Sequence, residues 1–167
     1  LLFDDGLCCW KPMPERLDHH RRVMAEMKKA LDLDRIDTVV PTHYHGDHVE
    51  MIPDVVAAEN ARVVCLNLVA DVLEHPHDYG VMCPLPWYGT GNDTVPIHQR
   101  ASDNARLGWC EYDIEFMHVG GQTYYHAAML ARVDGKRVAF IGDAVGLGAT
   151  APEPVLCYND GEPTGRG

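Results

Sequence analysis

The sequence predicts a mixed α/β fold in a single domain that spans residues 1–167. In the first half, short apolar runs rich in β-branched residues alternate with segments whose apolar residues recur at helical spacing. In the second half, from Glu111 onward, apolar and polar residues alternate one by one, which is typical of half-exposed antiparallel strands. A chain of this length holds one ordinary domain with its own core.

Six elements are predicted before residue 75. In chain order they are the end of a buried strand over residues 1–3, a helix over 15–33, a strand over 36–40, a helix over 49–59, a strand over 62–66 and a short helix over 67–74. The first helix is amphipathic because Leu17, Met27 and Leu31 recur at helical spacing. Pro53 fits the second helix only within its first turn, where a missing N–H leaves no hydrogen bond unmade.

Residues 75–100 show no sustained period and are rich in proline and glycine, which predicts an irregular loop. A loop of this length in a compact domain is commonly functional, and we expect it to lie over the site. Trp87 and Tyr88 within it either face a substrate as a lid or pin the loop to the domain.

Three strands are expected after this loop, over residues 112–116, 124–133 and 136–141. Asp134 and Gly135 between the last two indicate a hairpin turn. The glycine- and proline-rich tail, residues 146–167, predicts no regular element.

Charge and composition exclude several classes of partner. The chain carries a formal net charge of −11 and no basic stripe, so nucleic acid is not an expected partner. No apolar run is long enough to span a membrane. The first residues contain neither an initiator methionine nor a basic leader region, so we expect an internal piece of a longer chain. Six cysteines without a Cys-x-x-Cys pair favour a reducing, cytoplasmic setting.

A cluster of metal-ligand side chains follows the strand predicted over residues 36–40. His43, His45, Asp47 and His48 lie within six residues at the carboxyl end of that strand, where open α/β sheets build ligand sites. Imidazole nitrogens and carboxylate oxygens are ligands that zinc takes. No cysteine takes part, which favours an open site that holds water over a closed structural zinc site.

Residues 42–48, Thr-His-Tyr-His-Gly-Asp-His, resemble the His-x-His-x-Asp-His motif of the metallo-β-lactamase superfamily. Residues 1–6, Leu-Leu-Phe-Asp-Asp-Gly, resemble the strand-Asp-Gly segment that precedes this motif, and residues 140–143 resemble the later strand that ends in a metal-bridging aspartate. The resemblance covers nearly the whole chain. It implies a four-layer αββα sandwich, here incomplete at both ends, with one or two metal ions between the sheets.

The same resemblance implies a role for each ligand. His43 and His45 would hold the first metal, Asp47 and His48 the second, and Asp143 would bridge the two. Zinc is the expected cofactor, with iron or manganese as alternatives. A hydroxide held between the ions would be the nucleophile, and Asp47, the expected catalytic residue, would help to orient it.

The chain departs from the family pattern in two places. Where a Gly-His-Thr segment supplies the third ligand of the first metal, this chain has Gln122, whose neutral amide oxygen is a weaker partner for zinc. His126, which we favour, or His118 would replace the missing nitrogen; otherwise the first site is weakened. The family also supplies a last histidine from beyond the bridging aspartate, and no histidine follows Asp143 here.

Three functions are compatible with these residues. The favoured one is a metal-dependent hydrolase that acts on a small-molecule ester, thioester, lactone, amide or phosphodiester. The second, suggested by Gln122 and the missing last histidine, is a non-catalytic or degenerate metal-binding domain. The third is an iron-dependent oxidoreductase of the sulfur dioxygenase type. The oxygen-reducing diiron branch of the family is disfavoured, because it normally has glutamate where His45 stands.

Overall fold

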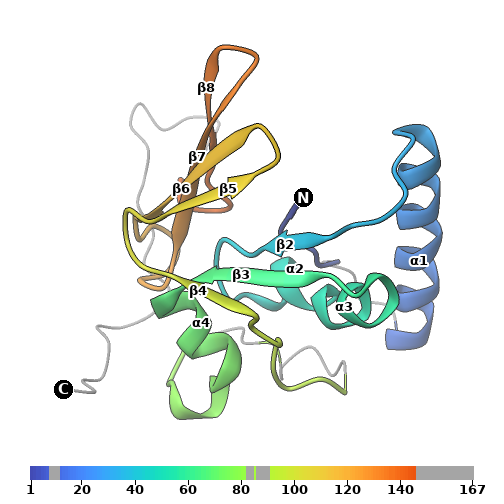
Figure 1. Cartoon of the computed structure of the whole chain (residues 1–167). Coiled ribbons are helices and arrows are strands. Elements are labelled where there is room, and N and C mark those ends of the chain that lie inside the picture. Colours follow the sequence, from blue (N-terminus) through green and yellow to red (C-terminus); the bar gives the residue numbers. More distant parts are fainter. Residues whose placement is uncertain (8–11, 82–84, 86–90, 146–167) are drawn as a thin grey trace, which may run out of the picture.

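The structure, a computed structural model, describes residues 1–7, 12–81, 85 and 91–145. The predicted fold class is confirmed, because helices accompany two four-stranded sheets (Figure 1). The two sheets share one apolar core, to which β3 contributes Val63 and Cys65 and β6 contributes Ile114 and Phe116. Cys65 is fully buried, as its apolar neighbours in the sequence lead one to expect.

The first sheet is parallel throughout and has the strand order β1-β2-β3-β4. Its strands are β1 (Leu2–Phe3), β2 (Thr38–Val40), β3 (Arg62–Leu66) and β4 (Gln99–Ala101). The first three were predicted, although β1 is half-buried at the edge and not fully buried. The prediction missed β4, because Gln99 and Arg100 give this three-residue strand no apolar run.

The second sheet is an antiparallel meander in the order β5-β6-β7-β8. Its strands are β5 (Arg106–Trp109), β6 (Tyr112–His118), β7 (Ala127–Val133) and β8 (Lys136–Phe140). Asp134 and Gly135 both have positive φ and form the predicted hairpin turn. β7 begins three residues later than predicted, and β5 was missed because it is short and interrupted by Gly108.

Helix α1 (Met13–Ala30) begins and ends earlier than the predicted helix over residues 15–33. Pro14 lies in its first turn, where no N–H is needed, and so does not break the chain. Asp32, at φ 52°, ends the helix. The expected apolar face is only partly correct, since Leu31 is 62% exposed whereas the buried positions of α1 are Arg16 and His20.

The single helix predicted over residues 49–59 is two helices, α2 (Gly46–Val49) and α3 (Ile52–Glu59). Pro53 lies in the first turn of α3, so a continuous helix would leave the carbonyl of Val49 without a donor. The N–H of Met51 instead donates to the carbonyl of Asp5, at 3.0 Å. The second half of the histidine-rich segment is therefore a helical turn and not a loop.

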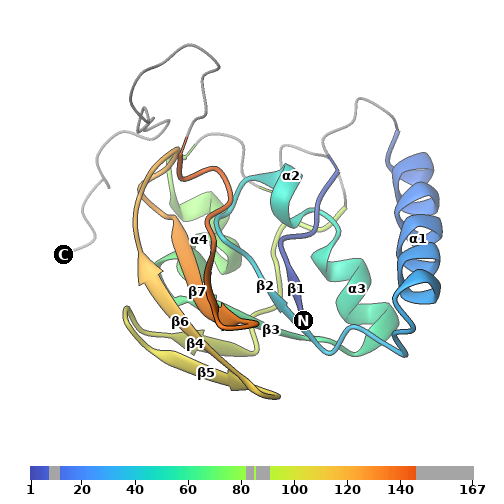
Figure 2. The same ribbon diagram turned by 90° about the horizontal axis from the view of Figure 1, so that it is seen from above.

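The remaining helices are α4 (Asn67–Glu74), which was predicted and contacts β3 and β4, and a 3-10 helix over Pro76–Asp78. Figure 2 shows the meander, the first sheet, α3 and α1 following one another across the molecule. The 3-10 helix and the start of β4 fall within the loop predicted over residues 75–100. Trp87 and Tyr88 lie outside the described residues. Among the described helices, none is long and apolar enough to cross a membrane.

Candidate metal centre

The candidate ligands lie where the carboxyl end of β2 passes into α2 (Figure 1). His43 and His45 are buried in the extended segment between the two elements. Asp47 and His48 lie in the single turn of α2 and are partly exposed. The extended backbone ends at His45 and helical geometry begins at Gly46. This change of direction brings His48 back toward His43, with ring centroids 4.2 Å apart.

Three of the predicted ligands come together in space. His43, His48 and Asp143 each offer one ligand atom, and these atoms lie within 4.8 Å of one another. The Nε2 atom of His48 lies 3.3 Å from a carboxylate oxygen of Asp143 and 3.9 Å from one of Asp47. Asp143 follows β8 of the second sheet, so this group joins the two sheets at one edge. Two imidazoles and a carboxylate are a donor set suited to zinc or a similar divalent cation.

Asp4, which we did not predict as a site residue, accepts hydrogen bonds from residues of the histidine motif. Its carboxylate accepts hydrogen bonds from the backbone N–H of Thr42 at 2.6 Å and from the Thr42 hydroxyl at 2.8 Å. The same carboxylate lies 3.1 Å from Nδ1 of His48. The sequence feature that could have identified Asp4 is the Asp-Gly segment after the first strand. The pairing of β1 with β2 brings this segment close to the histidine motif.

This network fixes which nitrogen of each ring is available to a cation. The hydroxyl proton of Thr42 goes to Asp4, so the Nδ1–H of His43, 3.0 Å away, donates to the Thr42 oxygen. The lone pair of His43 therefore sits on Nε2, which is buried and makes no hydrogen bond to a described residue. In the same way Nδ1–H of His48 donates to Asp4 and leaves Nε2 facing Asp143.

The two histidines differ in their affinity for protons. Burial lowers the pKa of His43 strongly, and the nearby rings of His48 and His126 lower it further. Burial also acts to lower the pKa of His48, but the hydrogen bond that His48 donates to Asp4 and the charges of Asp4, Asp143 and Asp47 outweigh it and raise that pKa. The ring of His43 is therefore neutral and can offer a lone pair to a metal ion. The carboxylates around His48 favour a cation beside that ring.

His45 packs edge-on against His43, with ring centroids 4.7 Å apart, and lies outside the group of three. Gln122 lies beside His43 and acts weakly against the lowering of its pKa, although no hydrogen bond of standard geometry reaches Nε2 of His43. Whether Gln122 contributes a ligand to a metal held by His43 stays a prediction.

His126 stacks on His43 at 4.4 Å between ring centroids and 11° between ring planes. Its Nε2–H donates to the carbonyl of Ile141 at 2.9 Å, which leaves a buried Nδ1 with no hydrogen-bond partner among the described residues. His118 instead faces its own loop, since its Nε2 lies 2.7 Å from the carbonyl of Tyr124. His126 is therefore the better placed of the two predicted substitutes, and its role as a ligand stays a prediction.

Gly142 allows the end of β8 to approach the histidine motif. Its φ is +46°, and a Cβ at this position would overlap the Thr42 hydroxyl and lie 3.1 Å from Nε2 of His126. A side chain here would therefore push Asp143 away from His43 and His48.

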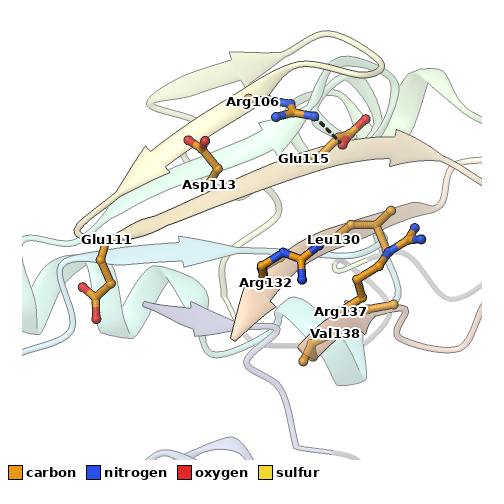
Figure 3. A pocket seen from close by; sticks show the side chains of 10 residues that line it. Arg106, Glu111, Asp113, Glu115, Leu130, Arg132, Arg137 and Val138 are labelled. Carbon is orange, nitrogen blue, oxygen red and sulfur yellow. Dashed lines mark hydrogen bonds and ion pairs between the residues drawn. The ribbon is translucent and has the colours of Figure 1, made fainter. Parts of the chain in front are cut away.

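A hollow of about 740 Å³ lies elsewhere, on the face of the second sheet opposite to Phe116 and Met129 (Figure 3). Its wall mixes arginines with carboxylates, and Arg106 of β5 pairs with Glu115 on the neighbouring strand β6 at 3.2 Å. None of the predicted site residues lines this hollow.

Comparison with known proteins identifies the family of the chain. A family model described as "Beta-lactamase superfamily domain" matches residues 10–153. The chain therefore belongs to the metallo-β-lactamase superfamily. None of the curated proteins searched matches the sequence significantly.

Solved structures of metallo-β-lactamases share the fold at low sequence identity. The enzyme of Cronobacter sakazakii with a HARLDQ motif has 16% identity and a TM-score of 0.62, over 84% of this chain and 48% of its own. The subclass B3 enzyme BJP-1 of Bradyrhizobium japonicum has 14% identity and a TM-score of 0.60, over 84% of this chain and 51% of its own. The class B3 di-zinc enzyme LRA-12 from an Alaskan soil metagenome has 12% identity and a TM-score of 0.62, over 83% and 50%. The chain thus spans about half the length of these structures.

Proposed function

We propose that this protein is a zinc-dependent hydrolase that acts on a small-molecule ester, thioester, lactone, amide or phosphodiester. The observation that carries the proposal is the convergence of His43, His48 and Asp143 within 4.8 Å. The fit to a cation is supported by the buried Nε2 of His43, which has no hydrogen-bond partner among the described residues. A buried polar atom without a partner is costly, and a bound metal ion would satisfy it.

The chain's own residues would each have a distinct task. His43, His48 and Asp143 would hold the metal, while Asp4 and Thr42 keep both rings in the tautomer that offers Nε2. A zinc ion there would lower the pKa of a bound water toward neutrality and so supply a nucleophile at ordinary pH.

Asp47 is suited to orienting the attacking water. Its carboxylate is 29% exposed and lies 3.9 Å from Nε2 of His48. Hydrogen bonding to the water would direct a lone pair toward the substrate carbonyl or phosphoryl atom and hold the proton that leaves it. Asp47 is therefore the residue whose loss should lower turnover more than metal content.

The test combines metal analysis with a substrate panel. The purified protein is stripped with a chelator, reloaded with zinc and assayed on chromogenic esters, thioesters, lactones, amides and phosphodiesters. We expect hydrolysis that zinc restores, that His43→Ala abolishes together with metal binding, and that Asp47→Asn lowers with metal retained. His77→Ala, at a histidine that is 72% exposed, is the matched control.

Two other results would each favour a different function. A zinc-loaded protein that is inactive on the whole panel supports a non-catalytic metal-binding domain, the reading suggested by Gln122 beside His43. Iron in the purified protein, with oxygen consumption, supports the oxidoreductase alternative.

A further inference from the structure

We infer that Arg16 and His20 of α1 are positioning residues, which fix the helical turn that presents Asp47 and His48. The inference rests on the proposed metal centre and extends it to helix α1, which contributes no ligand. The contacts that carry it run from α1 through Glu50 and Asp5 to α2.

The turn α2 has little stability of its own. It comprises only Gly46–Val49, and its N-terminal cap, His45, makes no side-chain capping hydrogen bond. A single helical turn is not stable by itself, because nucleation fixes several residues for one hydrogen bond. The directions of Asp47 and His48 must therefore be set by contacts from outside the turn.

Glu50 provides the first of these contacts. It is the C-cap residue of α2, and its side chain is fully buried. Its carboxylate accepts a hydrogen bond from the backbone N–H of Leu7 at 2.9 Å and another from the guanidinium of Arg16 at 2.5 Å. The end of the turn is thus held by an ion pair that α1 supplies.

Asp5 provides the second contact. Its backbone N–H donates to the carbonyl of His48 at 2.7 Å, and its carbonyl accepts from the N–H of Met51 at 3.0 Å. Both oxygens of its carboxylate lie 2.9 Å from Nε2 of His20. His20 therefore holds the residue whose backbone is bonded to the ligand turn.

The neighbouring glycine shows how closely the two segments fit. A Cβ on Gly6 would overlap the backbone of Asp47 and lie 2.7 Å from the N–H nitrogen of His48. Any displacement of residues 5–7 is therefore transmitted to the backbone of both predicted ligands.

The polar nature of these contacts argues for positioning and against simple stabilisation. Arg16 and His20 are the buried side chains of α1, whereas apolar residues of the same helix are partly or largely exposed. Apolar residues of similar volume commonly stabilise a fold as well as a buried ion pair does. An ion pair and a hydrogen bond that both oxygens of a carboxylate share add fixed direction, which a metal site requires.

The test compares two substitutions on the same helix. Arg16→Met removes the ion pair with Glu50, and Lys28→Met removes the ion pair between Lys28 and Glu59, which joins α1 to α3 and not to α2. Each variant is measured for amide hydrogen exchange over residues 46–51 in the metal-free protein. Each is also measured for Co²⁺ affinity and for the visible absorption spectrum of bound Co²⁺.

We expect Arg16→Met to speed exchange over residues 46–51, to weaken Co²⁺ binding by about tenfold and to alter the Co²⁺ spectrum. Lys28→Met should match the parent in all three measurements, and Arg16→Lys should restore part of the loss. His20→Leu should change the same readouts in the same direction. If Arg16→Met does not fold, Arg16→Met/Glu50→Met, which leaves no unpaired carboxylate, takes its place.

Parent-like exchange and Co²⁺ affinity in a folded Arg16 variant would overturn the inference, as would equal losses in Lys28→Met. Failure of the parent to bind Co²⁺ would overturn the proposed function instead. In that case hydrogen exchange alone decides whether α1 fixes the turn.

Discussion

Nδ1 of His48 lies 3.1 Å from the carboxylate of Asp4, although 44 residues separate them in the sequence. Thr42 donates two hydrogen bonds to the same carboxylate. Asp4 therefore determines that both His43 and His48 offer Nε2 to a metal ion. The motif over residues 42–48 supplies the ligands, but their tautomers depend on a residue outside it.

Asp4→Asn is expected to weaken zinc binding by about 10–100-fold, because an amide has one acceptor oxygen where the carboxylate has two. The Thr42 hydroxyl and Nδ1 of His48 share one carboxylate oxygen, and the Thr42 N–H uses the other. An amide group therefore either removes the acceptor of both side chains, so that neither ring is held in the required tautomer, or leaves the Thr42 N–H facing an NH₂ group. Affinity is measured by competition with a chromogenic chelator. Asp37→Asn is the control, since Asp37 accepts a hydrogen bond from Trp109 at the start of β2, away from the site. Equal losses in the two variants would contradict the prediction.

Gly142→Ala should lower both the free energy of unfolding and the zinc affinity. The positive φ costs about 1–2 kcal/mol for a residue with a Cβ, and the overlap with Thr42 adds to this cost. Gly135→Ala separates the two effects, since Gly135 has φ +76° but its Cβ would meet no atom within 4 Å. Denaturant unfolding of both variants should show the larger loss for Gly142→Ala, with reduced zinc affinity in that variant alone. Equal losses would mean that the close approach to Thr42 has no energetic effect.

Cys65 and Cys110 should differ in reactivity toward an alkylating reagent. Burial raises the pKa of the Cys65 thiol well above its usual value, whereas Cys110 is exposed. The thiolate is the reactive form, so the folded protein should be labelled at Cys110 long before Cys65. Peptide mapping by mass spectrometry after timed iodoacetamide treatment measures this order. Denaturant should remove the difference, and rapid labelling of Cys65 without denaturant would disagree with its burial in β3.

The sequence predicts the fold where the local pattern and the tertiary environment agree. Strands β2, β3, β6 and β8 were found because their apolar runs or alternation match their burial. Strand β4 has no such pattern, and its place beside β3 follows from tertiary pairing. The expected inward face of α1 was wrong at Leu31 because its buried contacts are made by Arg16 and His20, which the apolar pattern does not register.

The candidate site shows the same division. Local spacing was sufficient to single out His43 and His48, and the resemblance added Asp143, which lies beside them. Asp4 and Arg16 act across 44 and 34 residues of sequence, through contacts that only the pairing of β1 with β2 and the docking of α1 create. No spacing rule relates such residues to the motif.

His126→Ala tests whether this residue is the third ligand. If its Nδ1 binds the metal, the variant should lose at least about tenfold in zinc affinity. The substitution also removes the hydrogen bond to the carbonyl of Ile141, so some stability should be lost as well, about 1–3 kcal/mol. Comparing affinity with the midpoint of thermal unfolding distinguishes the two effects. A less stable variant with unchanged zinc stoichiometry and affinity would end the ligand proposal for His126.

Gln122→His is expected to raise zinc affinity, because it places an imidazole where the chain now has an amide beside His43. Gln122 is half-buried, and Nε2 of His43 has no hydrogen-bond partner among the described residues, so a second nitrogen there would converge on the same ion. The gain should be about tenfold or more in competition with a chelator, since one nitrogen ligand replaces a weak neutral oxygen.

Gln122→Leu provides the comparison, because it removes the amide without adding a ligand. If both variants bind zinc as the parent does, Gln122 lies outside the coordination sphere and the third ligand must come from another residue. If Gln122→His binds more tightly and Gln122→Leu more weakly, the amide oxygen is itself a ligand, and the first site is weakened but not lost.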